Sequence, residues 1–214
     1  MIRLDILSDP ICPWCYIGWT QLRRALEDHG DSPFEIEWHP FQLNPDMPKD
    51  GMDRSAYLEW KFGGPDGASQ VYGRIADHAR SIGLDLEFDA IARTPNTLDA
   101  HRLIHWAGLE ARQTPIVLAL FQAYFKDGRD IGAAEVLLDV AEAAGLDRAM
   151  IERLLSGDAD AEDIRARDAH ARARGVTGVP TFVIASQHVL PGAQPAETWA
   201  RVIEELAAKA APAP

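Results

Sequence analysis

The chain has 214 residues, of which 47% are hydrophobic and 25% are charged, and this length is enough to bury a substantial core. Its 21 basic and 33 acidic residues give a formal net charge of −12, which argues against a surface for nucleic acid or for an anionic membrane. No span approaches the roughly 20 apolar residues needed to cross a bilayer. The N-terminus lacks the features of a secretory signal, so we expect a cytoplasmic protein with no nucleic-acid or membrane partner.

The first elements form a βαβ unit. Residues 2–8 alternate between apolar and polar side chains and predict a strand. Pro13 suits the first turn of a helix, where its missing N–H costs nothing, and that helix is expected to end near Gly30. Residues 34–38 alternate again, which predicts a second strand parallel to the first.

The two cysteines of the chain, Cys12 and Cys15, lie between the first strand and the first helix. Cys12 is expected at the helix N-terminus, where unpaired N–H groups and the helix dipole favour a thiolate over a thiol. Cys15 follows one turn later on the same face, close enough to close a disulfide with Cys12. A cytosolic cysteine pair is more often catalytic or redox-sensing than structural, so we interpret the pair as a redox centre.

Two other interpretations of the cysteine pair stay open. The cysteines can be small buried hydrophobic residues, although such residues have no reason to recur at i, i+3 across a Pro-Trp pair. The spacing also suits half of a zinc site, for which His101 and His105 on a predicted helix supply a second pair of ligands.

A long helical segment follows, over about residues 52–175. Its predicted helices cover residues 55–62, 68–82, 97–109, 114–127, 133–144, 147–155 and 158–174. Asn96 or Thr97 is expected to cap the third of these helices, and residues 84–88 are read as an extended connector. The pattern then returns to strands over 181–185 and 188–190 and a helix from Pro195 to about 208, which make a ββα unit.

Four sequence stretches in this order resemble the thioredoxin-like superfamily. They are Ser-Asp-Pro-Ile-Cys-Pro-Trp-Cys-Tyr-Ile-Gly (8–18), Pro-Phe-Gln-Leu-Asn-Pro (40–45), Asn-Thr-Leu-Asp-Ala-His-Arg-Leu (96–103) and Gly-Val-Thr-Gly-Val-Pro-Thr-Phe (175–182). The chain is most similar to the DsbA-like branch and its FrnE-like dithiol oxidoreductases. The resemblance implies an α/β thioredoxin-like fold, formed by residues 1–51 and 176–214, with a large all-helical insertion over 52–175.

The resemblance also implies roles for particular residues. Cys12 matches the exposed nucleophile and Cys15 the thiol that resolves the mixed disulfide. Pro180 matches a proline that follows a cis peptide bond and faces the cysteines, which leaves the backbone of Val179 free to pair with a bound peptide. Pro13 and Trp14, between the cysteines, are expected to contact substrate. The implied function is that of a thiol–disulfide oxidoreductase or isomerase, with no metal and no cofactor beyond a redox-active Cys12–Cys15 disulfide.

The partners expected from this function are a disulfide-containing protein or peptide, or a small thiol, and a homodimer is compatible with the sequence. The alternative function is that of a glutathione-dependent isomerase or transferase, as in 2-hydroxychromene-2-carboxylate isomerases and kappa-class glutathione transferases. Those relatives typically carry serine in place of Cys12 and a Gly-x-Asp-Arg stretch where this chain has residues 192–195, Gly-Ala-Gln-Pro. Glutathione binding stays open, because Gln194 and the following helix N-terminus can receive a carboxylate. His39 is read as a satisfied histidine rather than a proton carrier.

Overall fold

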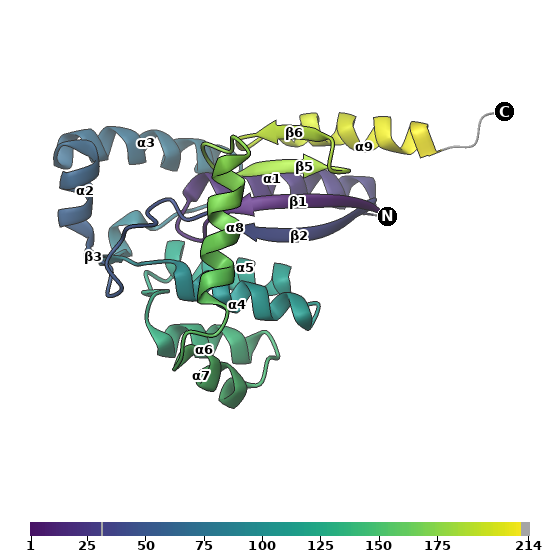
Figure 1. The fold of residues 1–214 in the computed structure, drawn as a ribbon. Helices are drawn as coiled ribbons and strands as arrows, with labels where there is room; N and C mark the ends of the chain where they lie inside the picture. The colour runs from purple at the N-terminus through teal and green to yellow at the C-terminus, as the bar shows by residue number, and fades with distance from the viewer. Residues whose placement is uncertain (31, 211–214) are drawn as a thin grey trace.

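The computed structural model describes residues 1–30 and 32–210. Its main sheet has the strand order β2-β1-β5-β6, with β1 parallel to β2 and antiparallel to β5 (Figure 1). These strands are β1 (Ile2–Ser8), β2 (Phe34–Pro40), β5 (Thr181–Ile184) and β6 (His188–Pro191). The predicted βαβ and ββα units are therefore confirmed, and β1 and β5 join them in one sheet.

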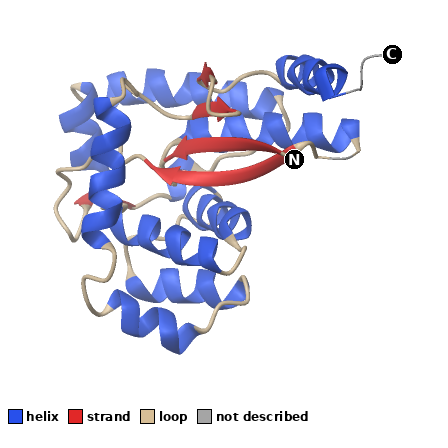
Figure 2. Cartoon of the chain, turned by 45° about the vertical axis from the view of Figure 1, so that its right-hand side comes forward, coloured by secondary structure: helices blue, strands red, loops and turns tan. Residues whose placement is uncertain are grey.

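Two helices cover one face of this sheet. They are α1 (Pro13–His29) and α9 (Ala196–Ala210), which pack against each other (Figure 2). Strand alternation directs Leu4, Ile6 and Phe182 into this layer, where all three are almost fully buried. Phe182 meets Trp199 of α9 edge to face, with ring centroids 4.8 Å apart.

The helices between β2 and β5 form the helical insertion. They are α2 (Arg54–Phe62), α3 (Pro65–Ser81), α4 (Leu98–Leu109), α5 (Gln113–Phe125), α6 (Ala134–Ala143), α7 (Arg148–Leu155) and α8 (Ala161–Ala173), with a 3₁₀ turn at Phe88–Ala90. All the predicted helices are present, with ends shifted by a few residues. The prediction missed a short antiparallel pair, β3 (Met52–Asp53) with β4 (Arg93–Thr94).

The start of α4 decides between Asn96 and Thr97 as the capping residue. Thr97 occupies the N-cap position but makes no capping hydrogen bond through its side chain. The amide oxygen of Asn96 instead accepts from the Leu98 N–H at 2.9 Å. The residue that satisfies an orphan N–H of the first turn is therefore Asn96.

The insertion is bonded to the sheet at Trp38 of β2. The Trp38 N–H donates to the side-chain oxygen of Gln113, and the Gln113 amide donates back to the Trp38 carbonyl, at 2.9 and 3.1 Å. The indole N–H of Trp38 donates to the Thr114 hydroxyl at 2.9 Å. These bonds from the start of α5 satisfy main-chain groups on the outer edge of β2, which would otherwise be open for pairing.

A buried arginine of α4 joins this helix to α7 and to the segment between α7 and α8. Arg102 of α4 is only 2% exposed, and its guanidinium donates to the carbonyl oxygens of Leu154, Gly157 and Ala159 at 2.6–2.7 Å. It also pairs with Asp99 at 2.7 Å. One side chain thus satisfies carbonyls in the last turn of α7 and in the α7–α8 connection, and it fixes this connection against α4.

Candidate active site

Cys12 lies directly after the turn that ends β1. The Cys12 N–H donates to the Asp9 carbonyl at 2.9 Å, and the extended backbone of Cys12 makes it the N-cap of α1, with Pro13 in the first turn. The Cys12 carbonyl accepts the N–H of Cys15 at 3.0 Å, which places the second cysteine one turn along the helix. Both cysteines are free thiols and lie 3.6 Å apart.

The loop before β5 lies against the cysteine pair. The peptide bond between Val179 and Pro180 is cis, and the Val179 carbonyl oxygen is 3.5 Å from the Cys12 Sγ. Gly18 of α1 permits this approach, because a Cβ there would lie 3.0 Å from the Pro180 Cγ and 3.3 Å from the ring of Phe182. The structure therefore brings together four of the residues singled out from the sequence, from segments 167 residues apart.

The prediction that Cys12 is exposed is wrong. Its residue surface is only 4% accessible, because the Val179 carbonyl and the surrounding apolar core cover it. Trp14 is 38% exposed, and its ring tilts against His78 of α3 with centroids 5.5 Å apart. Pro13 is buried, so Trp14 is the part of the motif that solvent reaches.

Cys15 differs from Cys12 in its surroundings. Burial, together with the neighbouring Cys12, raises the pKa of the Cys15 thiol well above its ordinary value, whereas the Ser8 hydroxyl and the Asp9 backbone act in the opposite direction. Cys15 therefore holds its proton at neutral pH. Ser8 is buried and its hydroxyl has no hydrogen-bond partner among the described residues, so it acts on Cys15 only through its proximity. Nothing in its position before the motif indicates this proximity.

The stability of the reduced protein is expected to fall as the pH rises above about 9. The Cys15 pKa is higher in the folded than in the unfolded chain, so its contribution is complete below the unfolded pKa and is lost as the pH rises through the folded pKa. Burial raises the pKa of Tyr124 in the same sense. Each such group contributes a slope of about 1.4 kcal/mol per pH unit.

Urea unfolding of the reduced protein between pH 7 and 10.5 measures this slope, and Cys15→Ala is the matched control. Without the Cys15 thiol, the unfolding free energy of the variant should fall less steeply with pH in the alkaline range, whatever its value at pH 7. Equal slopes for the two proteins would contradict the prediction.

Beneath the cysteine pair lies a buried acid–histidine pair. Asp9 is fully buried, and its carboxylate accepts the N–H groups of Leu43 and Ile11 at 2.7 and 3.4 Å. His101 of α4 is 3% exposed, and its Nε2 lies 3.7 Å from an Asp9 oxygen. This Nε2 has no hydrogen-bond partner among the described residues. The pair joins the active-site turn to the insertion, and no signal in the sequence marks Asp9 as a member of the site.

The structure does not support the zinc interpretation. Within the described residues, the group that brings three possible ligand atoms together is Asp5, Glu37 and His39, and neither cysteine belongs to it. His39 is already satisfied, because its ring contacts Asp5 at 2.7 Å and the Arg167 guanidinium at 3.3 Å. The interpretation of His39 as a satisfied histidine is therefore confirmed.

A model of the DSBA-like thioredoxin domain matches residues 3–204, and the chain belongs to this family, which comprises thiol–disulfide oxidoreductases and related isomerases. A crystal structure of a probable DsbA oxidoreductase from Streptomyces coelicolor is 30% identical and superposes with a TM-score of 0.85, covering 100% of this chain and 93% of the other. The family and the fold expected from the sequence are both confirmed.

Two further proteins are similar over nearly the whole chain. The cytosolic disulfide reductase DsbM from Pseudomonas aeruginosa is 19% identical with a TM-score of 0.69, covering 97% of this chain and 100% of the other, which shows a shared fold. The uncharacterized protein YwbO from Bacillus subtilis is 26% identical over 95% of this chain and 96% of its own length. In the part of the chain that the structure describes, no helix has the length and apolar character to span a membrane.

Proposed function

We propose that this protein exchanges electrons with disulfide substrates through Cys12 and Cys15. The Cys12 thiolate attacks one sulfur of the substrate disulfide, a mixed disulfide forms, and the other substrate sulfur leaves as a thiolate. Cys15 then loses its proton and attacks the Cys12 sulfur. The substrate leaves as a dithiol, the Cys12–Cys15 disulfide remains, and the reverse sequence oxidises a dithiol substrate.

The placement of the two thiols carries this proposal. Cys12 lies at the helix N-cap, where backbone N–H groups and the positive end of the helix dipole stabilise negative charge. Cys15 is adjacent and protonated, as a resolving thiol must be until the mixed disulfide has formed. Since Cys12 is 4% exposed, a substrate reaches its sulfur only when neighbouring side chains or the Val179 loop shift outward.

The cellular setting in this proposal is the cytoplasm, with a small thiol such as glutathione as the electron donor. The fold is shared with DsbM of P. aeruginosa, which is described as a cytosolic disulfide reductase and has a structure with glutathione. Glutathione is here a substrate rather than a resident cofactor. Its use as a cofactor is not favoured by residues 192–195, where the Gln194 amide already donates to the Pro191 carbonyl at 2.7 Å.

Trapping with Cys15→Ser tests the proposal. Without the resolving thiol, Cys12 should hold the substrate in a stable mixed disulfide, which intact-mass spectrometry detects as an adduct that dithiothreitol releases. A peptide with one internal disulfide and glutathione disulfide are the two probes. The double variant Cys12→Ser/Cys15→Ser should form no adduct, and absence of an adduct on Cys15→Ser with both probes would overturn the proposed function.

A further inference from the structure

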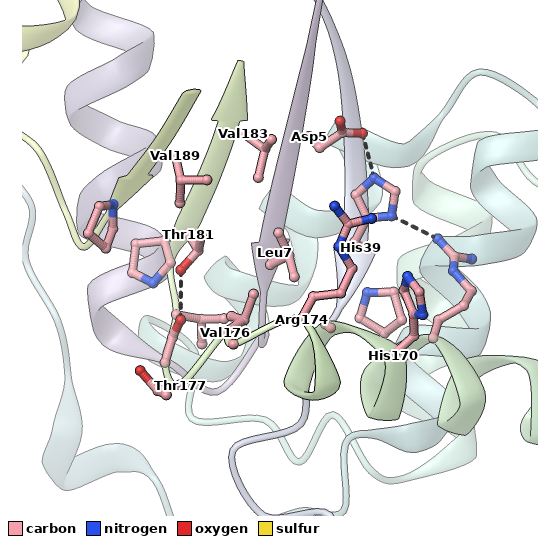
Figure 3. A pocket seen from close by; sticks show the side chains of 18 of the residues that line it. Asp5, Leu7, His39, His170, Arg174, Val176, Thr177, Thr181, Val183 and Val189 are labelled. Carbon is pink, nitrogen blue, oxygen red and sulfur yellow. Dashed lines mark hydrogen bonds and ion pairs between the residues drawn. The ribbon is translucent and has the colours of Figure 1, made fainter. Parts of the chain in front are cut away.

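An open groove runs along the face of the sheet that α1 and α9 do not cover. It has a volume of about 1090 Å³ and lies between α8 and the strands β1, β5 and β6 (Figure 3). Its apolar floor is made by Leu7, Val176, Val183 and Val189. Val189 is 58% exposed, which is a large exposure for a valine in a strand. The floor is thus a partly unpartnered apolar sheet face.

The groove exists because α8 covers only part of the four-stranded sheet on the face opposite α1 and α9. Alternation along β1 and β5 sends Leu7 and Val183 to the face opposite α1, away from the main core. On that face α8 packs against β2, at one side of the sheet. On the side formed by β5 and β6, Val183 and Val189 line the groove (Figure 3), and Val189 is the exposed one of the two.

The rim of the groove is positively charged, although the chain as a whole has a net charge of −12. Arg167 and His170 of α8 border the groove, as does Arg174, which follows the last residue of this helix. Arg167 also lies 3.9 Å from Asp163, one turn earlier in α8. Among the described residues, neither His170 nor Arg174 makes an ion pair through its side chain. The lining contains a single carboxylate, Asp5, which is already paired with Arg3 and His39.

One end of the groove is the loop that contacts the nucleophile. Val179 and Pro180 line the groove, and the Val179 carbonyl lies 3.5 Å from the Cys12 Sγ. A polypeptide joined to Cys12 by a disulfide therefore has a path over this loop onto the valine floor.

We propose that the groove docks an extended, acidic polypeptide segment that flanks the disulfide of a protein substrate. In such a segment, apolar side chains rest on the floor while alternate carboxylates face Arg174 and His170. The proposal rests on the proposed function, for which it defines a substrate class. A second copy of this chain fits less well, because it would bring the same cationic rim into the interface.

Peptides with defined arms test the docking. Each probe carries one internal disulfide followed by an eight-residue arm, which alternates valine with glutamate, with serine or with lysine. Wild type should react faster with the glutamate arm than with the serine arm, and slowest with the lysine arm. In Arg174→Glu the preference for glutamate over serine should fall about fivefold, because an attraction becomes a repulsion at an exposed site.

Arg153→Glu is the matched control, since it makes the same charge change on exposed α7, outside the groove. This control should keep the wild-type preference, and the preference of wild type should weaken as salt is raised. Equal rates for the three arms on wild type, or an equal loss of preference in both variants, would overturn the proposal.

A second measurement separates docking from chemistry. Fluorescence anisotropy of the glutamate arm alone, without any disulfide, reports binding to the groove even if no exchange occurs. Binding that Arg174→Glu weakens and Arg153→Glu preserves supports the groove independently of the proposed function. If the arm binds but no disulfide exchange occurs, only the proposed function is overturned. If exchange occurs but the arm does not bind, only the proposed docking in the groove is overturned. Binding of the glutamate arm with the stoichiometry of one arm per two chains would assign the face to a second copy instead.

Discussion

Replacement of Arg102 by alanine is expected to lower the free energy of unfolding by about 3–5 kcal/mol. The guanidinium is 2% exposed and satisfies the carbonyl oxygens of Leu154, Gly157 and Ala159. Its removal leaves these acceptors without their donor and opens a cavity beside Trp106, over which the guanidinium stacks. Urea unfolding at pH 7 measures the loss.

Arg153→Ala on the exposed surface of α7 is the control for Arg102→Ala, and it should change the free energy of unfolding by less than about 0.5 kcal/mol. Arg102→Lys should recover only part of the loss, because an ammonium group cannot reproduce the planar set of donors that reaches several carbonyls at once. A loss below about 1 kcal/mol for Arg102→Ala would show that water replaces the guanidinium at these carbonyls.

Cys12→Ser is expected to lower the rate of reaction with a peptide disulfide by at least about 10³-fold. A serine hydroxyl does not ionise at neutral pH and is a poor nucleophile toward sulfur, so the N-cap position has no reactive group left to present. The measurement is stopped-flow or quenched-flow mass spectrometry with the reduced protein. Circular dichroism should show an unchanged fold, since the substitution is nearly isosteric.

The control for this variant is Cys15→Ser, which keeps the nucleophile. Each molecule of this control should still form one mixed disulfide through Cys12. A Cys12→Ser protein that reacts within tenfold of wild type would assign the first attack to Cys15. Such a result would contradict the assignment of Cys12 as the nucleophile and of Cys15, whose pKa is raised by burial, as the resolving thiol.

The sequence predicted the elements well because their signals are local. Gly30 after α1, Asp147 before α7 and Pro13 in the first turn each determine one helix end by their own chemistry. The pair β3–β4 was missed because two residues per strand carry no periodicity, and these strands are joined across a gap of about forty residues.

The sequence predicted which cysteine, valine and proline residues form the site better than it predicted their burial and their contacts. The cysteine spacing placed Cys12 and Cys15 on one helical turn, and the family motif brought in Val179 and Pro180. The burial of Cys12 was not predictable, because it arises from a loop 167 residues away in the chain. The Asp9–His101 pair is likewise a tertiary contact between two segments that the sequence treats as unrelated.

The Asp9–His101 pair also limits how this architecture can be shortened. The carboxylate has no access to water, and its partners come from the active-site turn, from Leu43 and from α4. A chain reduced to the sheet with α1 and α9 would take the Leu43 N–H and His101 away from this carboxylate and would strip Gln113 and Thr114 from the edge at Trp38. The redox half is therefore not a separable module: the helices inserted into it complete its interior, and the two parts are expected to fold and unfold as one cooperative unit.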